Sequence, residues 1–370
     1  MSLPLLHPIR RIGAHYLFPS SSGRSPLATQ KVSWKYMSTN VDQSSVHVAF
    51  VGLGNMGLQM AMNLARNKPV DNAGQGIRIH RLTVHDKNDA NVTKFMNLAE
   101  TEGLDRFSLI SSAPDLATLA ESSPDFVVTS LPTCEASEAV VETIVKKLPS
   151  DHEHGTIFID TSTVGVSTSR KLHNLVTSTA PQSDYSDAPV SGGVKGATDA
   201  TLTFMVGFSS PTTLSSITPI LEKMGKAIIP CGGPGSGSAV KLCNNAALAA
   251  QMLGICEAMN LGEKLGVDPK VLAGVMNVST AQCWSSKVNN PHPVVAKDIG
   301  SGASANEYEG GFGTSLMLKD LNLAVDAAEE QGLAMPVSGL TRDLYRMADS
   351  HGYGSKDFGV ILQFLKGARV

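Results

Sequence analysis

Several features are missing from this chain of 370 residues, and each absence argues against a class of protein. No run of about 18 apolar residues occurs, so no segment is predicted to span a membrane. The histidines show no ligand spacing, and no metal site is predicted. A net charge of −3, without a clustered basic face in the body of the chain, argues against nucleic-acid binding.

Cysteines are few, odd in number and never paired at metal-ligand spacing. This usage fits free thiols in a reducing compartment better than a disulfide framework. The five are Cys134, Cys231, Cys243, Cys256 and Cys283. With 42% apolar and 17% charged residues, the composition is that of an ordinary soluble globular protein, and the length suits two domains.

Residues 1–41 differ from the rest of the chain. They hold five basic residues, many serines and no acid, since the first carboxylate is Asp42. This composition predicts a mitochondrial transit peptide, cleaved near Met37–Asn40, and hence a protein of the mitochondrial matrix. A disordered tail with no targeting role is the alternative. Removing the five charges takes the net charge from −3 to −8.

Strands and helices alternate from Val46 to Gly233, which predicts a dinucleotide-binding domain at 46–233 with a doubly wound, Rossmann-type parallel sheet. A helix is expected from Met56 to Asn67, and a surface insertion over 68–80. The clearest strands are expected at 46–54, 81–86, 125–131 and 156–163.

After Gly233 the pattern becomes almost wholly helical, which predicts an all-α domain over 236–366. A long helix from Ser236 to Leu265, rich in Ala, Leu and Met, is expected to be buried on most sides. Asp268 and Pro269 then read as an N-cap followed by proline at the first helical position. The fold class is therefore α/β, with a helical second domain built around one long helix.

The motif GLGNMG at 52–57 follows the first strand and opens the first helix, the context that a dinucleotide-binding turn requires. Gly52 suits the tight turn, Gly54 the approach of a pyrophosphate to the backbone, and Gly57 close packing of helix on strand. The helix N-terminus then faces the phosphates. The cofactor-binding residues predicted in this turn are Gly52, Leu53, Gly54, Asn55, Met56 and Gly57.

Asp86 ends the next predicted strand and is placed to accept hydrogen bonds from the ribose hydroxyls, which favours NAD over NADP. Its distance from the glycines exceeds the usual spacing, and the insertion at 68–80 accounts for the difference. A simple turn-forming role for Asp86 is the alternative, and the neighbouring Lys87 weakens the exclusion of NADP.

The segment GSGSAVKLCNN at 235–245 places Lys241 and Asn245 four residues apart, on one face of an apolar helix. Burial without a partner lowers the pKa of a lysine, which makes it an acid/base group near neutral pH. A lysine whose stem lies along the helix with its ammonium in solvent would give the same pattern.

The segment DAPVSGGVKGA at 187–197 predicts a strand that ends at Val190, followed by a turn. Ser191, Gly192 and Gly193 offer a hydroxyl and unhindered backbone N–H groups, which can hold a carboxylate. A plain strand-to-turn connection is the alternative for this segment alone.

GLGNMG, DAPVSGG, GSGSAVKLCNN and GFGTSLMLKDLNLA (311–324) appear in the order and spacing found in the β-hydroxyacid dehydrogenase family, which the chain resembles over about residues 46–366. CWSS at 283–286 and NEYEGGFGTSLMLKDL resemble the branch that acts on 3-hydroxyisobutyrate. The resemblance implies NAD-dependent oxidation of 3-hydroxyisobutyrate to methylmalonate semialdehyde in valine catabolism.

The same resemblance implies roles for individual residues. Lys241 would be the catalytic acid/base, and Asn245 would orient a substrate whose carboxylate is held by Ser191, Gly192 and Gly193. The further cofactor contacts carried over from the family are Leu131, Pro132, Thr163 and Lys319.

Two positions depart from the branch pattern. Ala136 stands where asparagine is frequent, so no cofactor contact is assigned there, and Gln282 replaces a common arginine, which leaves substrate preference open. Relatives with these motifs reduce tartronate or succinic semialdehyde. A cofactor-sensing scaffold is the non-enzymatic alternative, and the presence of Lys241, Asn245 and Ser191 argues against it.

The expected partners are a small β-hydroxyacid and further copies of the chain, with no nucleic acid and no membrane. The long apolar helix predicts a homo-oligomer, a dimer or tetramer, although a core helix within one domain would show the same composition.

Overall fold

The computed structural model describes residues 45–66, 77–104, 109–150, 152 and 154–367. The leader predicted at 1–41 lies outside these residues, as does most of the insertion predicted at 68–80. The end of that insertion was wrongly assigned: strand β2 begins at Arg78 rather than Arg81, because Ile79 already pairs with Val46 of β1 and is buried in the core.

Nine strands of the described chain form one sheet, in the order β3-β2-β1-β4-β5-β6-β8-β7, with β9 paired to β8. Their bounds are β1 (Ser45–Val51), β2 (Arg78–His85), β3 (Leu109–Ser112), β4 (Phe126–Thr129), β5 (Ile157–Asp160), β6 (Asp184–Asp187), β7 (Val190–Ser191), β8 (Leu202–Gly207) and β9 (Gly225–Gly232).

The part from β3 to β6 is parallel throughout and has the 3-2-1-4-5-6 order of a doubly wound dinucleotide-binding sheet. The predicted fold class is thereby confirmed. Beyond β6 the sheet contains a feature that the sequence pattern did not indicate: β8 runs antiparallel to β6 and β7, joined to β6 through the single pair Asp187–Gly207.

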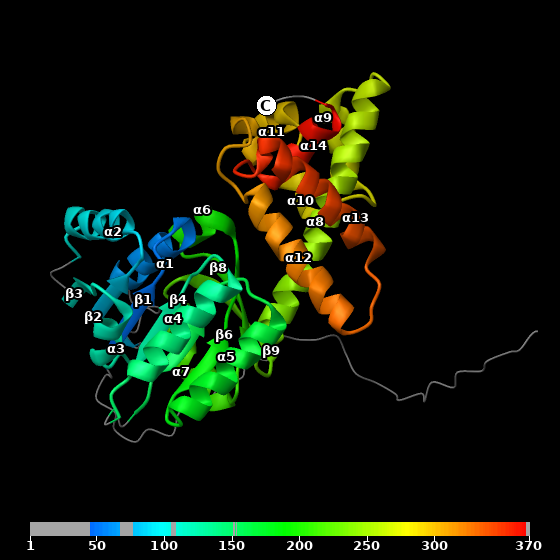
Figure 1. Ribbon diagram of the computed structural model, residues 1–370. Helices are drawn as coiled ribbons and strands as arrows, with labels where there is room; N and C mark the ends of the chain where they lie inside the picture. Colours follow the sequence, from blue (N-terminus) through cyan, green and yellow to red (C-terminus); the bar gives the residue numbers. More distant parts are fainter. Residues whose placement is uncertain (1–44, 67–76, 105–108, 151, 153, 368–370) are drawn as a thin grey trace, which may run out of the picture. The chain divides into compact units, whose positions relative to one another are not determined.

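Helices cover both faces of the sheet, as a parallel sheet requires (Figure 1). Val48 and Phe50 of β1 pack in the core under α1, α2, α6 and α7, whereas the alternate residues Ala49 and Val51 pack under α3, α4 and α5. These helices are α1 (Asn55–Arg66), α2 (Asp89–Thr101), α3 (Leu116–Glu121), α4 (Cys134–Lys147), α5 (Val166–Thr179), α6 (Gly193–Thr198) and α7 (Pro211–Leu221).

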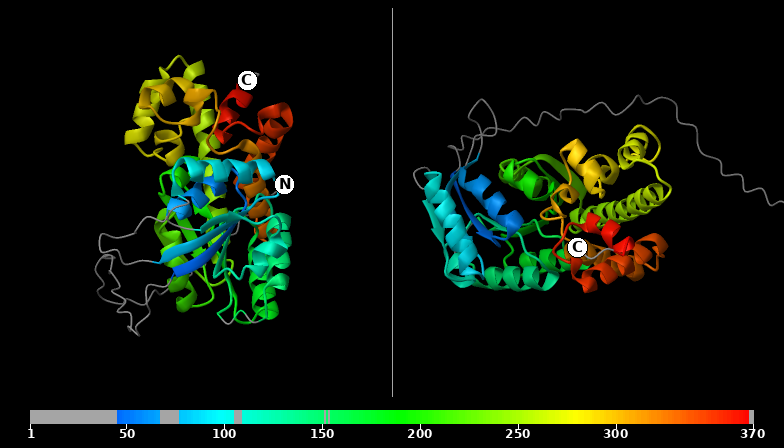
Figure 2. Two further views of the ribbon diagram at one scale, coloured as in Figure 1. Left: turned by 90° about the vertical axis from the view of Figure 1, so that its left-hand side faces the viewer. Right: turned by 90° about the horizontal axis from the view of Figure 1, so that it is seen from above.

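The remaining residues are helical and share a separate core that includes Met252, Met317, Tyr345 and Phe358. Figure 2 shows these helices from two further sides, with α8 in yellow-green, α9 to α11 in yellow to gold, and α12 to α14 in orange to red. They are α8 (Ser236–Lys264), α9 (Pro269–Val278), α10 (Trp284–Lys287), α11 (Pro293–Ile299), α12 (Thr314–Glu330), α13 (Pro336–Ala348) and α14 (Ile361–Leu365), with short turns η2 (Ala303–Asn306), η3 (Asp349–Tyr353) and η4 (Phe358–Val360).

The long helix α8 begins at the predicted residue and ends one residue before the predicted Leu265. Asp268 caps α9 as predicted, since its carboxylate accepts a hydrogen bond from Lys270 N at 2.7 Å. In the single chain α8 is buried along the side that packs on α12, α13 and α14, while Val240, Ala247 and Leu261 on its other side are exposed. Among the described residues, no helix has the length and apolarity needed to cross a membrane.

Candidate active site

The turn between β1 and α1 requires glycine at two of its three glycine positions. Gly52 has φ +96°, and a Cβ there would lie 2.3 Å from Ser130 O. A Cβ on Gly57 would lie 1.9 Å from Gly52 O, so helix and strand approach too closely for any side chain. A Cβ on Gly54 would meet nothing within 4 Å. The turn is therefore tight where it packs and open where a phosphate group would approach its backbone.

Asp86 follows β2 directly, and its carboxylate reaches back to the glycine turn. Oδ2 accepts a hydrogen bond from Leu53 N at 2.6 Å, and Oδ1 accepts one from Asn88 N at 2.8 Å. The second bond is the turn-forming role that the sequence left open, and the first links Asp86 to the expected cofactor turn. Each oxygen has a further lone pair for a ligand hydroxyl.

The loops after β4 and β5 lie side by side at the carboxyl ends of these strands. Leu131 N donates to Ser162 Oγ at 2.8 Å, and Thr163 O accepts from Lys319 Nζ at 2.7 Å. Pro132 is exposed in the same loop as Leu131. The carboxyl ends of parallel strands are where ligands bind in such sheets, so the four residues assigned by resemblance lie where a cofactor site is expected.

Lys241 is 7% exposed, and its Nζ donates to Ser191 Oγ at 3.1 Å. The lysine therefore points inward, unlike the solvent-directed lysine that the sequence also allowed. Burial lowers the pKa of Lys241 to about 8; the Asp320 carboxylate opposes this shift, and the charge of Lys319 adds to it. An amine with this pKa exchanges protons readily near neutral pH.

Asn245 lies one helical turn beyond Lys241 and is also buried. Its Nδ2 donates to Asp320 Oδ2 at 2.6 Å, and its Oδ1 accepts from Asn244 Nδ2 at 3.1 Å. The Lys319 ammonium lies 3.3 Å from the other oxygen of Asp320. The buried Asp320 thus connects the lysine that faces Thr163 with the amide beside Lys241.

Asp320 was not assigned a role from the sequence. The available signal was an acid next to Lys319 inside the largely apolar segment GFGTSLMLKDLNLA, but sequence alone does not say that it is buried. The structure places Asp320 on α12, where its carboxylate faces α8 and accepts a hydrogen bond from Asn245.

The serine-glycine segment differs slightly from the predicted strand end at Val190. Ser191 still belongs to β7, and Gly193 is already the first residue of α6. Gly192 and Gly193 have φ values of +138° and +62°, a region that favours glycine. Both glycines are exposed beside Ser191, so their backbone is accessible to a ligand.

Hydrogen bonds and close contacts connect these elements into one series. Gly52 packs on Ser130, Leu131 bonds Ser162, Thr163 bonds Lys319, and Asp320 bonds Asn245 of the helix that carries Lys241. The series runs from the glycine turn to the lysine and to Ser191. The arrangement combines an open dinucleotide-type turn, a proton-exchanging amine and a hydroxyl within reach of that amine.

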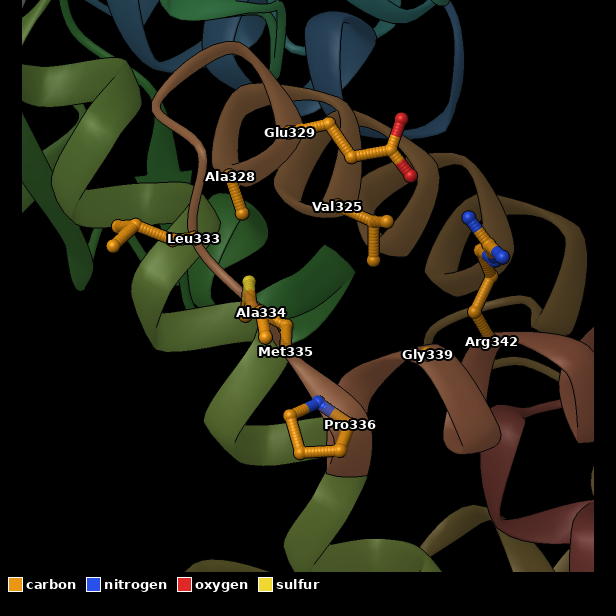
Figure 3. Close-up of a pocket in the computed structure, with 9 residues that line it drawn as sticks. All are labelled: Val325, Ala328, Glu329, Leu333, Ala334, Met335, Pro336, Gly339 and Arg342. Atoms are coloured by element: carbon orange, nitrogen blue, oxygen red, sulfur yellow. The ribbon is translucent and has the colours of Figure 1, made fainter.

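A cavity of about 370 Å³ lies elsewhere, between the end of α12 and the start of α13. Figure 3 shows its apolar floor, which includes Val325, Leu333 and Met335, with Glu329 and Arg342 at its edge. It shares no residue with the site described above.

Two models of known protein families together match nearly the whole of the described chain. Residues 47–233 match a family model described as the NAD binding domain of 6-phosphogluconate dehydrogenase. Residues 235–365 match one described as "NAD-binding of NADP-dependent 3-hydroxyisobutyrate dehydrogenase".

Among curated relatives, mitochondrial 3-hydroxyisobutyrate dehydrogenase of Homo sapiens is 38% identical over 326 residues, covering 87% of this chain and 88% of that protein. The enzyme of the same name from Drosophila melanogaster is 38% identical over 321 residues, 86% of this chain and 89% of that protein. Among solved structures, Mycobacterium tuberculosis 3-hydroxyisobutyrate dehydrogenase with L-serine is 34% identical, with a TM-score of 0.72, over 87% of this chain and 100% of that chain.

Proposed function

Because the chain belongs to the 3-hydroxyisobutyrate dehydrogenase family, we propose that it oxidises 3-hydroxyisobutyrate to methylmalonate semialdehyde with NAD, and that Lys241 is the general acid/base. The observation that carries the proposal is the buried Lys241, with its pKa lowered to about 8 and its Nζ 3.1 Å from Ser191 Oγ. NAD, when bound, accepts the hydrogen and the electron pair removed from the alcohol carbon.

The residues present fit that cofactor. The open Gly54 position and the N-terminus of α1 would hold the pyrophosphate, and the Asp86 carboxylate would accept from the ribose hydroxyls. Leu131, Pro132, Thr163 and Lys319 would complete the site at the ends of β4 and β5. Asp86 also disfavours a 2′-phosphate, which supports NAD as the preferred cofactor over NADP.

Lys241 in its neutral form removes the hydroxyl proton of the substrate, and the ammonium returns it when the reaction runs as a reduction. Ser191, with the backbone of Gly192 and Gly193, holds the substrate carboxylate, and Asn245 orients the reacting end. Asp320 fixes the Asn245 amide and keeps a negative charge near the two lysines.

The decisive experiment is steady-state kinetics with NAD and NADP on 3-hydroxyisobutyrate and related β-hydroxyacids, run in reverse with tartronate and succinic semialdehydes. The proposal requires the highest kcat/KM for 3-hydroxyisobutyrate with NAD. Preference for another substrate would reassign the enzyme within its family. No turnover on any of them would favour the non-enzymatic scaffold, which the contact between Lys241 and Ser191 argues against.

The curated relatives carry mitochondrial names, and the basic leader at 1–41 supports import into the mitochondrial matrix, where valine catabolism would supply the substrate. A fusion of residues 1–45 to a fluorescent protein should be imported and shortened. A fusion that stays in the cytosol at full length would refute this localisation.

We also propose that the chain forms a homo-oligomer, a dimer or tetramer, through the far end of α8 and the adjoining α9. Leu261 and Leu265 are 60% and 71% exposed, and the outward side of α9 carries Val271, Val275 and Val278 at helical spacing. Contiguous apolar surface of this kind marks association sites in soluble proteins. A second copy is the occupant that supplies the same apolar face in a two-fold contact.

A further inference from the structure

The first turn of α8 is held by a carboxylate from the sheet. Asp187, the last residue of β6, accepts a hydrogen bond from Gly235 N through Oδ1 and one from Ser238 N through Oδ2, each at 2.8 Å. Asp187 is 1% exposed, so both bonds are shielded from water. Backbone N–H groups at a helix start lack partners within the helix, and Gly235 has no side chain with which to supply one.

This arrangement differs from the other side-chain caps in the molecule. Among the described helices, α2, α3, α4, α7, α9 and α11 are each capped by the residue directly before the helix, namely Asn88, Asp115, Thr133, Ser210, Asp268 and His292. The cap of α8 comes from 48 residues earlier in the chain. It therefore ties the helix that carries Lys241 to a fixed point of the sheet.

Two further contacts fix the same turn. Ser238 Oγ lies 2.8 Å from Ser169 Oγ of α5, and both side chains are fully buried. A Cβ on Gly237 would lie 2.2 Å from Met205 O of β8, so the helix backbone lies directly against the sheet. The start of α8 is thus packed between β6, β8 and α5.

The path from this anchor to the reacting groups is short on both sides. Ser191 follows Asp187 by four residues in the chain, and Lys241 follows Ser238 by three, about 4.5 Å along the helix axis. The hydrogen bond from Lys241 Nζ to Ser191 Oγ closes the loop between them. A shift of the first turn would therefore change the position of Lys241 relative to Ser191.

We propose that Asp187 is a positioning residue: by anchoring the first turn of α8, it keeps Lys241 buried and within hydrogen-bonding distance of Ser191. The inference rests on the role of Lys241 proposed above. Burial raises the pKa of Asp187, while its bonds from Ser238 N and Gly235 N lower it, and Asp160 on the neighbouring strand is the nearby charge that raises it further. Asp187 acts through these backbone bonds and does not touch the substrate.

The test is Asp187→Asn, which keeps the size of the side chain but turns an amide N–H toward one of the two backbone donors. Loss of a hydrogen bond to a charged group should lower kcat roughly 10- to 100-fold, with the KM for NAD nearly unchanged. Lysine side chains labelled with ¹⁵N give a second readout in the free protein, with Lys241→Met identifying the signal. The pKa of Lys241 should move from about 8 toward that of an exposed lysine.

Asp184→Asn is the matched control, because Asp184 lies on the same strand but accepts from Thr213 Oγ1, at 2.6 Å, near the start of α7. It should lower stability without changing kcat or the Lys241 titration. If Asp187→Asn fails to fold by circular dichroism, the smaller neutral variant Asp187→Ser replaces it, with the same expected direction.

A wild-type kcat and an unchanged Lys241 titration in the Asp187 variant would overturn the inference. So would a fall in kcat with the Lys241 pKa still near 8, since the loss would then not act through the placement of Lys241. Failure of the proposed function is distinguishable: Lys241→Met itself would then turn over normally, whatever Asp187 does to the titration.

Discussion

The two ends of α8 depart in opposite ways from the usual distribution of residues in proteins, in which polar groups lie at the surface and apolar groups in the interior. At its start, polar groups are buried: Asp187 against its first turn, then Lys241 and Asn245 on the helix itself. At its far end, apolar groups are exposed, with Leu261 on α8 and Val278 on α9 at 60% and 87% exposure. Buried charge and exposed apolar surface are both unfavourable for a chain that only has to fold.

The difference agrees with the two roles proposed for this helix, catalysis at its start and association at its far end. Polar groups in the interior are retained where chemistry needs them, and apolar groups on the surface are retained where another molecule covers them. The comparison predicts that substitutions at the start of α8 change catalysis, whereas those at its far end change association. Five measurements test or refine this division.

The largest effect is expected from Lys241→Met, which removes the acid/base group while keeping an unbranched side chain. Turnover should fall by roughly 100- to 10,000-fold, the range of general acid/base catalysis. NAD affinity, measured by fluorescence titration, should persist, because the glycine turn is untouched. Near wild-type turnover would refute the assignment of Lys241.

The same residue predicts the pH profile. Oxidation needs the neutral amine, so kcat/KM of the wild type should rise with pH through about 8 and level off above it. The Lys241→Met variant should lack this limb.

The second effect concerns stability: the substitution that lowers turnover, Lys241→Met, should stabilise the fold. Lys241 has a lower pKa folded, about 8, than unfolded, 10.5, so below pH 8 the folded chain carries a buried charge that the unfolded chain keeps hydrated. A difference of this size corresponds to a cost on the order of 3 kcal/mol. Lys241→Met should therefore raise the melting temperature at pH 7 by several degrees.

This gain should shrink as pH rises from 8 to 10.5, because the unfolded chain then binds more protons than the folded one and wild-type stability recovers. Lys195→Met is the control: Lys195 is fully exposed beside Asp199, and its removal should leave stability almost unchanged. A Lys241 variant no more stable than wild type at pH 7 would contradict the burial cost.

The third effect is on association. Val271→Glu places a charge on the outward side of α9, where burial of a valine contributes about 1.5 kcal/mol or more. We expect the oligomer to dissociate at concentrations roughly 10- to 100-fold higher than wild type, measured by light scattering across a dilution series. Ile229→Glu, on the exposed side of β9, should leave the oligomer intact. A wild-type protein that is monomeric in the same dilution series would refute the proposed homo-oligomer.

The smallest effect is expected at the cofactor. Asp86→Ser removes the carboxylate that accepts from ribose, so the KM for NAD should rise about tenfold while that for NADP rises less. Since Asp86 also bonds Leu53 N, loosening of the turn affects both cofactors, and the ratio of the two kcat/KM values is the informative quantity. Asp89→Ser, at an exposed position in the first turn of α2, is the control. If the wild-type enzyme used NAD and NADP equally well, Asp86 would not select between the two cofactors.

Much of this site follows from local sequence patterns. Gly52 and Gly57 could be predicted because the tight turn leaves no room for a side chain at either position, and Gly54 because it completes the spacing of the motif. The bounds of α8 followed from a composition rich in Ala, Leu and Met with few charges. Lys241 and Asn245 share a face for the same local reason, the helical period.

What could not be predicted depends on contacts between distant segments. Asp320 lies 75 residues from the amide it bonds, and Asp187 lies 48 residues from the helix it caps. The antiparallel β8 likewise depends on pairing rather than on its own residues. The sequence also could not show that α8 is buried on one side only. An apolar helix has the same composition whether its other side packs against its own chain or against another copy.

Inherited substitutions at two glycines of α8 are expected to have opposite effects on the protein. Every missense codon change at a glycine adds a Cβ, so Gly237, which lies against Met205 O, has no tolerable replacement, conservative or otherwise. Gly254, further along the same helix, is exposed with nothing within 4 Å of such an atom, and alanine there should even favour the helix by about 0.5–1 kcal/mol. Among variants found in populations, Gly254→Ala is therefore expected to be tolerated, and Gly237→Ala to be damaging.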